Sequence, residues 1–166
     1  SFVVSVVRLY PKMSTGRIRN LSDFANLARE DYEEAYHLFV SGNFKNLIRR
    51  DEITERMLYE GLSGGMRSKT AMEEFLVSIR KKETVHFYAK KNAYEFAGII
   101  ETEKEEIPLI KNQWGYLEIT VSSDADFLVL LKQRLTTEDF VGSTCKLEYL
   151  IDPAKLHAGK NFGRLV

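Results

Sequence analysis

The spacing of the apolar residues changes near residue 83, and this change limits the chain to a few fold classes. Between about residue 20 and that point, apolar side chains recur every three or four residues, as they do on one face of an α-helix. After it, apolar and polar residues alternate, as they do along a half-buried β-strand. The later part has no helical pattern long enough for parallel crossovers, so its strands should be antiparallel. The sequence therefore predicts an α+β fold.

Three regions follow from this change of period. Residues 1–19 are predicted to be an N-terminal strand, β-branched over residues 2–9, and a linker after Pro11. Residues 20–82 are predicted to be a helical subdomain. Residues 83–166 are predicted to be an antiparallel, immunoglobulin-like β-sandwich domain, because short strands separated by turn-like segments are typical of that architecture.

Five helices are expected in the helical subdomain. Ser22 should cap the first helix, and Thr70 and Glu73 have the spacing of a capping box for the fifth. The second helix should cover residues 32–40, a short third should start at Phe44, and the fourth should end at Gly61. In the β-sandwich domain, strands are expected at residues 84–89, 94–100, 107–110, 116–122, 127–131, 145–151 and 162–166, with charged residues 101–106 as a turn.

The charge balance narrows the choice of partners. Lys and Arg together number 24, as do Asp and Glu, so no net field draws the chain toward nucleic acid. No apolar run approaches the roughly 20 residues that a membrane helix needs, so direct membrane insertion is not expected. The single cysteine, Cys145, rules out an internal disulfide but leaves the cellular compartment open.

The two ends of the sequence indicate a fragment of a longer protein. The chain begins with Ser1 rather than Met and stops at Val166 within an apolar run. Its partners should therefore be neighbouring domains of the parent chain or another protein. The strand at residues 2–9 has no hairpin partner beside it, so we expect it to pair with a sheet edge in its own chain or in a neighbouring molecule.

No catalytic, cofactor or metal constellation is predicted. The glycine-rich stretch at residues 61–67 resembles the signature motif of ABC-type ATPases, but a P-loop beside it would need glycine at Ser63 and Ser68. Cys145 sits in an alternating strand, where a small apolar side chain is usual. The three histidines form no pair at metal-ligand spacing, and the acids around Asp124 and Asp126 match no calcium loop.

Trp114 and Tyr116, on either side of Gly115, are the candidate ligand-binding residues. Aromatic rings of this kind can form a surface on which a sugar ring stacks, although aromatic side chains on strands more often belong to a core. They are the basis for a carbohydrate-binding alternative.

Several stretches carry a resemblance to a known type of module. They are residues 112–116, 123–127, 137–142, 149–152 and 156–163, with sequences such as NQWGY, TEDFVG and LHAGKNFG. The chain resembles an uncharacterised module of long multidomain proteins of gut-type Firmicutes, in which immunoglobulin-like sandwiches alternate with helical segments. This resemblance implies a bacterial parent and an architecture, and it supplies no catalytic residues. The sequence thus predicts a non-enzymatic structural or protein-interaction module, with a carbohydrate-binding or accessory domain of a glycan-active protein as the alternative.

Overall fold

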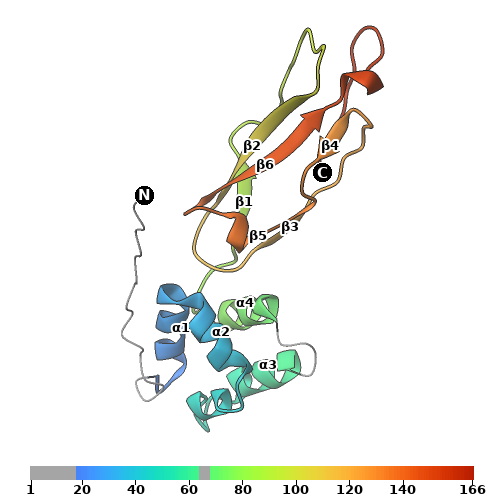
Figure 1. The fold of residues 1–166 in the computed structure, drawn as a ribbon. Helices are drawn as coiled ribbons and strands as arrows, with labels where there is room; N and C mark the ends of the chain where they lie inside the picture. The colour runs from blue at the N-terminus through green and yellow to red at the C-terminus, as the bar shows by residue number, and fades with distance from the viewer. Residues whose placement is uncertain (1–17, 64–67) are drawn as a thin grey trace, which may run out of the picture.

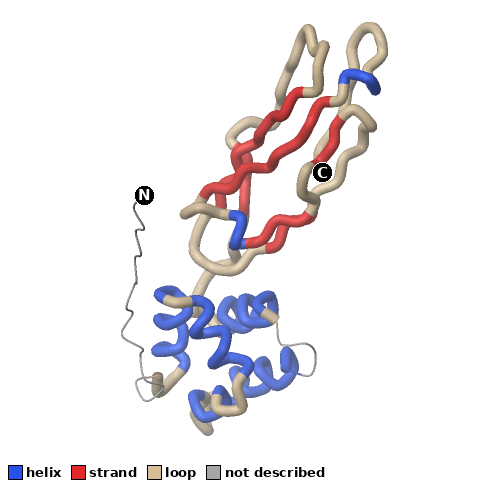
Figure 2. Tube along the Cα trace, viewed as in Figure 1, coloured by secondary structure: helices blue, strands red, loops and turns tan. Residues whose placement is uncertain are grey.

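The computed structural model describes residues 18–63 and 68–166, and it confirms the α+β class. The α-helices gather at one end of the molecule, and the strands extend away from them (Figures 1 and 2). The strand predicted at residues 2–9 and the glycine-rich residues 64–67 lie outside the described residues. None of the described helices is both long enough and apolar enough to cross a membrane.

The helical half contains α1 (Leu21–Glu30), α2 (Tyr32–Val40), the 3₁₀ helix η2 (Phe44–Leu47), α3 (Ile53–Ser63) and α4 (Lys69–Ser78). The second helix has the bounds expected from its sequence. Asp31 both ends α1 and caps α2, because its side chain accepts a hydrogen bond from the amide of Glu34 at 3.1 Å.

Three helix ends differ from the sequence prediction. Asn20, not Ser22, caps α1, because its side chain reaches a first-turn amide at 2.8 Å. Ser68, not Thr70, caps α4 in the same way at 3.1 Å, which leaves Glu73 free for another role. Helix α3 runs past Gly61 to Ser63, since one glycine inside a helix costs only about 1 kcal/mol and does not by itself end it.

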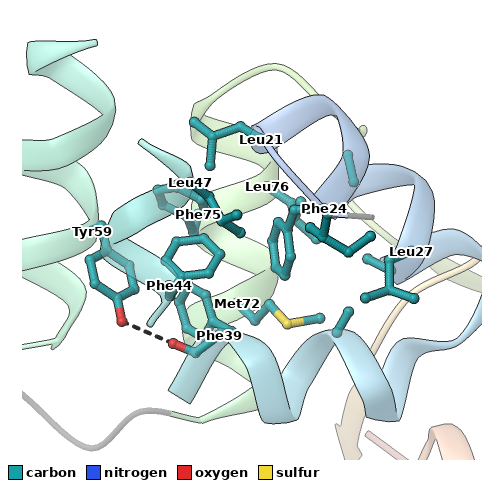
Figure 3. Packing of buried hydrophobic residues seen from close by; sticks show 14 of the residues in the cluster. Leu21, Phe24, Leu27, Phe39, Phe44, Leu47, Tyr59, Met72, Phe75 and Leu76 are labelled. Atoms are coloured by element: carbon teal, nitrogen blue, oxygen red, sulfur yellow. Dashed lines mark hydrogen bonds between the residues drawn. The ribbon is translucent and has the colours of Figure 1, made fainter. Parts of the chain in front are cut away.

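Five aromatic rings fill the core of the helical half (Figure 3). Every helical element contributes to this aromatic core, and neighbouring ring centroids lie 4.6–6.2 Å apart. The hydroxyl of Tyr59 donates a hydrogen bond to the Phe39 carbonyl at 2.9 Å, so the one polar atom among the rings has a partner. The rings belong to Phe24, Phe39, Phe44, Tyr59 and Phe75. Such ring pairs add about 0.5–1.5 kcal/mol each beyond the burial of their area.

The β half contains two antiparallel sheets. The larger has the order β1-β2-β6-β4, and the smaller pairs β3 with β5. The strands are β1 (Phe87–Ala89), β2 (Glu103–Lys111), β3 (Glu118–Thr120), β4 (Leu128–Leu130), β5 (Arg134–Thr136) and β6 (Thr144–Ile151). One apolar cluster joins the sheets, because Leu109 and Leu147 of the larger pack with Ile119 and Leu135 of the smaller.

The start of the β half departs most from the sequence prediction. Residues 94–100 form no strand, and the partner of β1 is the far end of β2, with Ala89 opposite Leu109. The charged residues predicted as a turn instead belong largely to β2. Their charges are accommodated across the sheet, where Lys104 lies 3.2 Å from Glu148 and Lys146 lies 3.5 Å from Glu106.

The later strands follow the prediction more closely. Strands β4 and β6 fall within or beside their expected ranges, whereas β3 is shorter than expected and β5 was not predicted. Residues 162–166 form no strand of either sheet, and they pair with the segment after β3 through an isolated bridge between Leu165 and Ser123. Alternation therefore located β4 and β6 closely, and it overestimated the segments at residues 94–100 and 162–166.

Candidate functional site at the helix–sheet junction

The best-connected polar group of the junction is the carboxylate of Glu73, on the face of α4 that meets the β half. One of its oxygens accepts hydrogen bonds from the Tyr32 hydroxyl at 2.9 Å and from the Tyr116 amide at 2.6 Å. The other lies 2.8 Å from the ammonium of Lys82. A single side chain thus joins two helices, the β half and the segment between them.

Lys82 lies fully inside the junction, with no exposed side-chain surface. Its ammonium also donates to the Glu83 carbonyl at 3.0 Å and lies 4.8 Å from the centroid of the Trp114 ring. A buried ammonium is costly unless it is paired and hydrogen-bonded. Here a carboxylate, a carbonyl and an aromatic face meet that requirement together.

Gly115 allows the β half to approach this ion pair closely. Its φ is +127°, and a Cβ at this position would lie 2.5 Å from a Glu73 oxygen and 2.7 Å from the Lys82 nitrogen. No side chain fits that space, and L residues avoid this φ. Glycine here is therefore a requirement of the junction rather than a turn preference.

Two tyrosines of the junction have perturbed acidities. Burial, reinforced by the nearby Glu73 carboxylate, holds the pKa of Tyr32 far above its ordinary value. Desolvation and the hydrogen bond to Glu118 raise the pKa of Tyr116 to about 12. Both hydroxyls therefore stay protonated at neutral pH and act as hydrogen-bond donors.

A cleft of about 290 Å³ opens beside this ion pair, between the two halves. Helices α1, α2 and α4 provide one wall, and the end of β2, the loop after it and the 3₁₀ helix η3 (Thr137–Asp139) provide the other. The residues that line it are Ala28, Arg29, Tyr32, Glu33, Lys69, Lys111, Trp114, Gly115, Tyr116, Thr137 and Glu138. Both candidate ligand-binding aromatics, Trp114 and Tyr116, are among them.

In the comparison with family models, residues 1–166 match the family of unknown function DUF5717, N-terminal. The chain belongs to this family. Comparisons with curated proteins and with solved structures give no match. The resemblance noted from the sequence agrees with this match in one respect, because both point to a family of unknown function.

The other candidate residues of the DUF5717 N-terminal chain are not brought together. Cys145 is buried in β6, and desolvation raises the pKa of its thiol, so it packs as a small apolar side chain. Asp124 accepts a hydrogen bond from the Arg164 amide at 2.6 Å, which ties the last residues of the chain to the sheet. Among the described residues no three histidine, cysteine or acidic side chains gather as metal ligands.

Sequence reasoning missed the residues that organise this DUF5717 junction. Its spacing from Thr70 places Glu73 in a predicted capping box, and Tyr32 and Lys82 stand in no recognisable motif. One usable signal was Gly115 between two aromatic residues, since an isolated glycine of this kind often marks a close approach of the backbone.

Proposed function

We propose that the chain is a non-enzymatic structural or protein-interaction module that holds its helical and β halves in one fixed relative orientation. The observation that supports this most directly is the set of contacts made by Glu73. Its carboxylate is bonded by groups of both halves and paired with a fully buried lysine, Lys82. A buried ion pair whose hydrogen bonds are satisfied in one geometry penalises every other arrangement of the groups around it.

The partners of such a module would be neighbouring domains of a longer bacterial chain or another protein. The description of the family as N-terminal supports the first of these. The resemblance to long Firmicutes proteins supports it too. Two antiparallel sheets that share one apolar cluster support the immunoglobulin-like sandwich that this resemblance implies. The balance of positive and negative charges argues against nucleic acid as a partner.

Distance measurements between the two halves test this proposal. In a Cys145→Ala background, spin labels would replace exposed Asn26 of α1 and exposed Thr120 of β3. Pulsed electron spin resonance should give one narrow distance distribution. Glu73→Gln should broaden it, whereas Glu74→Gln, an exposed neighbour on the same helix, should not. A broad distribution in the unsubstituted chain would contradict a fixed orientation.

The strand predicted at residues 2–9 would give the module a way to contact its partners. We propose that it pairs with a sheet edge, in its own chain or in a neighbouring molecule. β1 and β4 are the edge strands of the larger sheet, and each has only three residues, so both offer unpaired backbone groups. Deleting residues 1–10 should lower either the free energy of unfolding or the number of chains in the particle measured in solution. A truncated chain that keeps both its stability and its oligomeric state would contradict the pairing.

Carbohydrate binding is the second candidate function. The observation that favours it is that Trp114 and Tyr116 both line the 290 Å³ cleft. Lys82 covers the indole from inside the fold and does not line the cleft, so the cleft reaches Trp114 from another side. Trp114 is the one tryptophan of the chain, so its fluorescence should change when a neutral oligosaccharide binds. An unchanged spectrum at millimolar oligosaccharide would contradict this candidate.

A further inference from the structure

Two cationic side chains line the cleft without an anionic partner among the described residues. They are Arg29, in the last turn of α1, and Lys111, the last residue of β2. The other lysine of the cleft wall, Lys69, is paired with Glu33. Arg29 is exposed to solvent, whereas Lys111 is partly buried.

Lys111 is the more informative of the two. Its ammonium lies 5.7 Å from the centroid of the Phe140 ring, and desolvation lowers its pKa. The carboxylate of Glu73, whose charge partly offsets this effect, is already paired with Lys82. A partly buried cation with no carboxylate of its own can gain more from an incoming anion than a cation fully hydrated at the surface.

The remaining polar groups of the cleft are largely engaged. The Thr137 hydroxyl accepts from the Leu117 amide at 2.8 Å and donates to the Gly115 carbonyl at 3.4 Å. The Tyr32 hydroxyl donates to Glu73. The exposed carboxylate of Glu138 is the one acidic group of the lining without a salt bridge to a described residue. The two unpaired cations thus exceed the one unpaired anion.

We propose that the junction cleft binds a small organic carboxylate. Its carboxylate would pair with Lys111 and Arg29, and its apolar body would lie against Trp114 and Tyr116. The volume of about 290 Å³ is at the lower end of the range of small-molecule pockets, about 300–1,000 Å³, so the ligand would be the size of one ring with its substituents. An acidic monosaccharide and an aromatic acid share this chemistry. The site goes beyond the structural role proposed above, which does not depend on it.

Trp114 supplies the probe for a titration, because it is the one tryptophan in the sequence and lies in the cleft wall. Glucuronate, benzoate, glucose and inorganic phosphate would be added separately to the full chain, with excitation selective for tryptophan. We expect saturable changes with glucuronate or benzoate, and none with glucose or phosphate. Whether glucuronate or benzoate binds more tightly identifies the body of the ligand, and either result supports the site.

Lys111→Met tests the anchor, since it removes the charge and keeps most of the apolar stem. We expect it to weaken carboxylate binding about tenfold or more, in line with loss of one charge-assisted hydrogen bond. Lys104→Met is the matched control, because it removes an exposed lysine from the same strand and should leave binding unchanged. Thermal unfolding of both variants verifies that they fold.

Several outcomes would overturn the proposal. Binding of glucose as tight as that of glucuronate would leave carbohydrate binding standing and reject the carboxylate requirement. Equal binding of phosphate and carboxylates would reject the apolar contact. No saturable change with any of the four probes, or equal affinities in the Lys111→Met and Lys104→Met variants, would reject the site.

Discussion

The carboxylate of Glu73 lies 2.8 Å from the ammonium of Lys82, in an ion pair that is almost closed to water. The two residues are nine positions apart, on α4 and on the segment that leads to β1. Because the same carboxylate also accepts the Tyr116 amide, the pair belongs to the interface of the two halves and not to either one alone. Removing either charge of the pair should therefore change the stability of the whole chain.

Glu73→Met should be strongly destabilising, because it leaves the Lys82 ammonium buried without a counter-charge. Breaking a buried pair from one side typically costs about 3–5 kcal/mol. Lys82→Met should cost a comparable amount for the converse reason. The double variant should be more stable than the sum of the single effects implies, since apolar side chains can replace both charges. Urea denaturation of the four proteins measures this coupling. Additive effects would show that the two charges do not depend on each other.

Gly115→Ala should lower the free energy of unfolding by at least about 2 kcal/mol. The new methyl group would overlap a Glu73 oxygen at 2.5 Å, and alanine disfavours a φ of +127°. Gly142→Ala is the control, because its φ is +63° and no other side chain or backbone segment lies within 4 Å of the position that its methyl group would take. That variant should lose only about 1–2 kcal/mol, the cost of the backbone conformation. Equal losses in the two variants would mean that crowding at Gly115 is absorbed by movement of the loop.

Local sequence signals predicted much of the helical half. Helix α2 has the bounds expected from its apolar spacing, and the apolar residues of the first two helices form the core. Such features depend on neighbours three or four positions apart, which the sequence displays directly. Cap residues were harder to predict, because each of these helices has two candidate caps close together. Ser22 competes with Asn20 at α1, and Thr70 competes with Ser68 at α4. Only the final geometry decides between them.

The junction and the first β strands could not be predicted in this way. Strand β1 pairs with residues beyond a long connection, and nothing local distinguishes that partner from residues 94–100. Glu73 and Lys82 are ordinary charged residues in sequence, and their burial depends on the β half that covers them. The sequence did identify Trp114 and Tyr116 as unusual, without indicating that helices would form the opposite wall of their cleft.

Cys145 should be inert in the folded protein. It is 3% exposed in the middle of the β core, and burial raises the pKa of its thiol, so little thiolate forms at neutral pH. A thiol reagent at pH 7 should label it slowly, and labelling should become fast in urea. Cys145→Ala should cost about 1 kcal/mol or less if the site collapses around the smaller side chain. Rapid labelling of the folded chain would place the thiol at the surface.

Tyr32 should make the chain less stable at alkaline pH. An unfolded tyrosine loses its proton near pH 10, whereas the folded Tyr32 keeps it to a much higher pH because its hydroxyl is buried and donates to Glu73. Above pH 10 the unfolded state therefore binds fewer protons than the folded state, and the free energy of unfolding falls as pH rises. The contribution is complete below pH 10 and shrinks by up to about 1.4 kcal/mol for each further pH unit.

Tyr32→Phe isolates this effect, because all other titrating groups are common to both proteins. The wild-type chain should exceed the variant in stability at pH 8, where the Tyr32 hydrogen bond to Glu73 is intact. This difference in unfolding free energy should shrink between pH 10 and pH 11. It should change sign if the hydrogen bond contributes less free energy than the wild-type chain loses because folded Tyr32 stays protonated. Urea denaturation at pH 8, 9, 10 and 11 measures both curves. If they stay parallel across this range, the Tyr32 hydroxyl is accessible to water and the junction is open at that point.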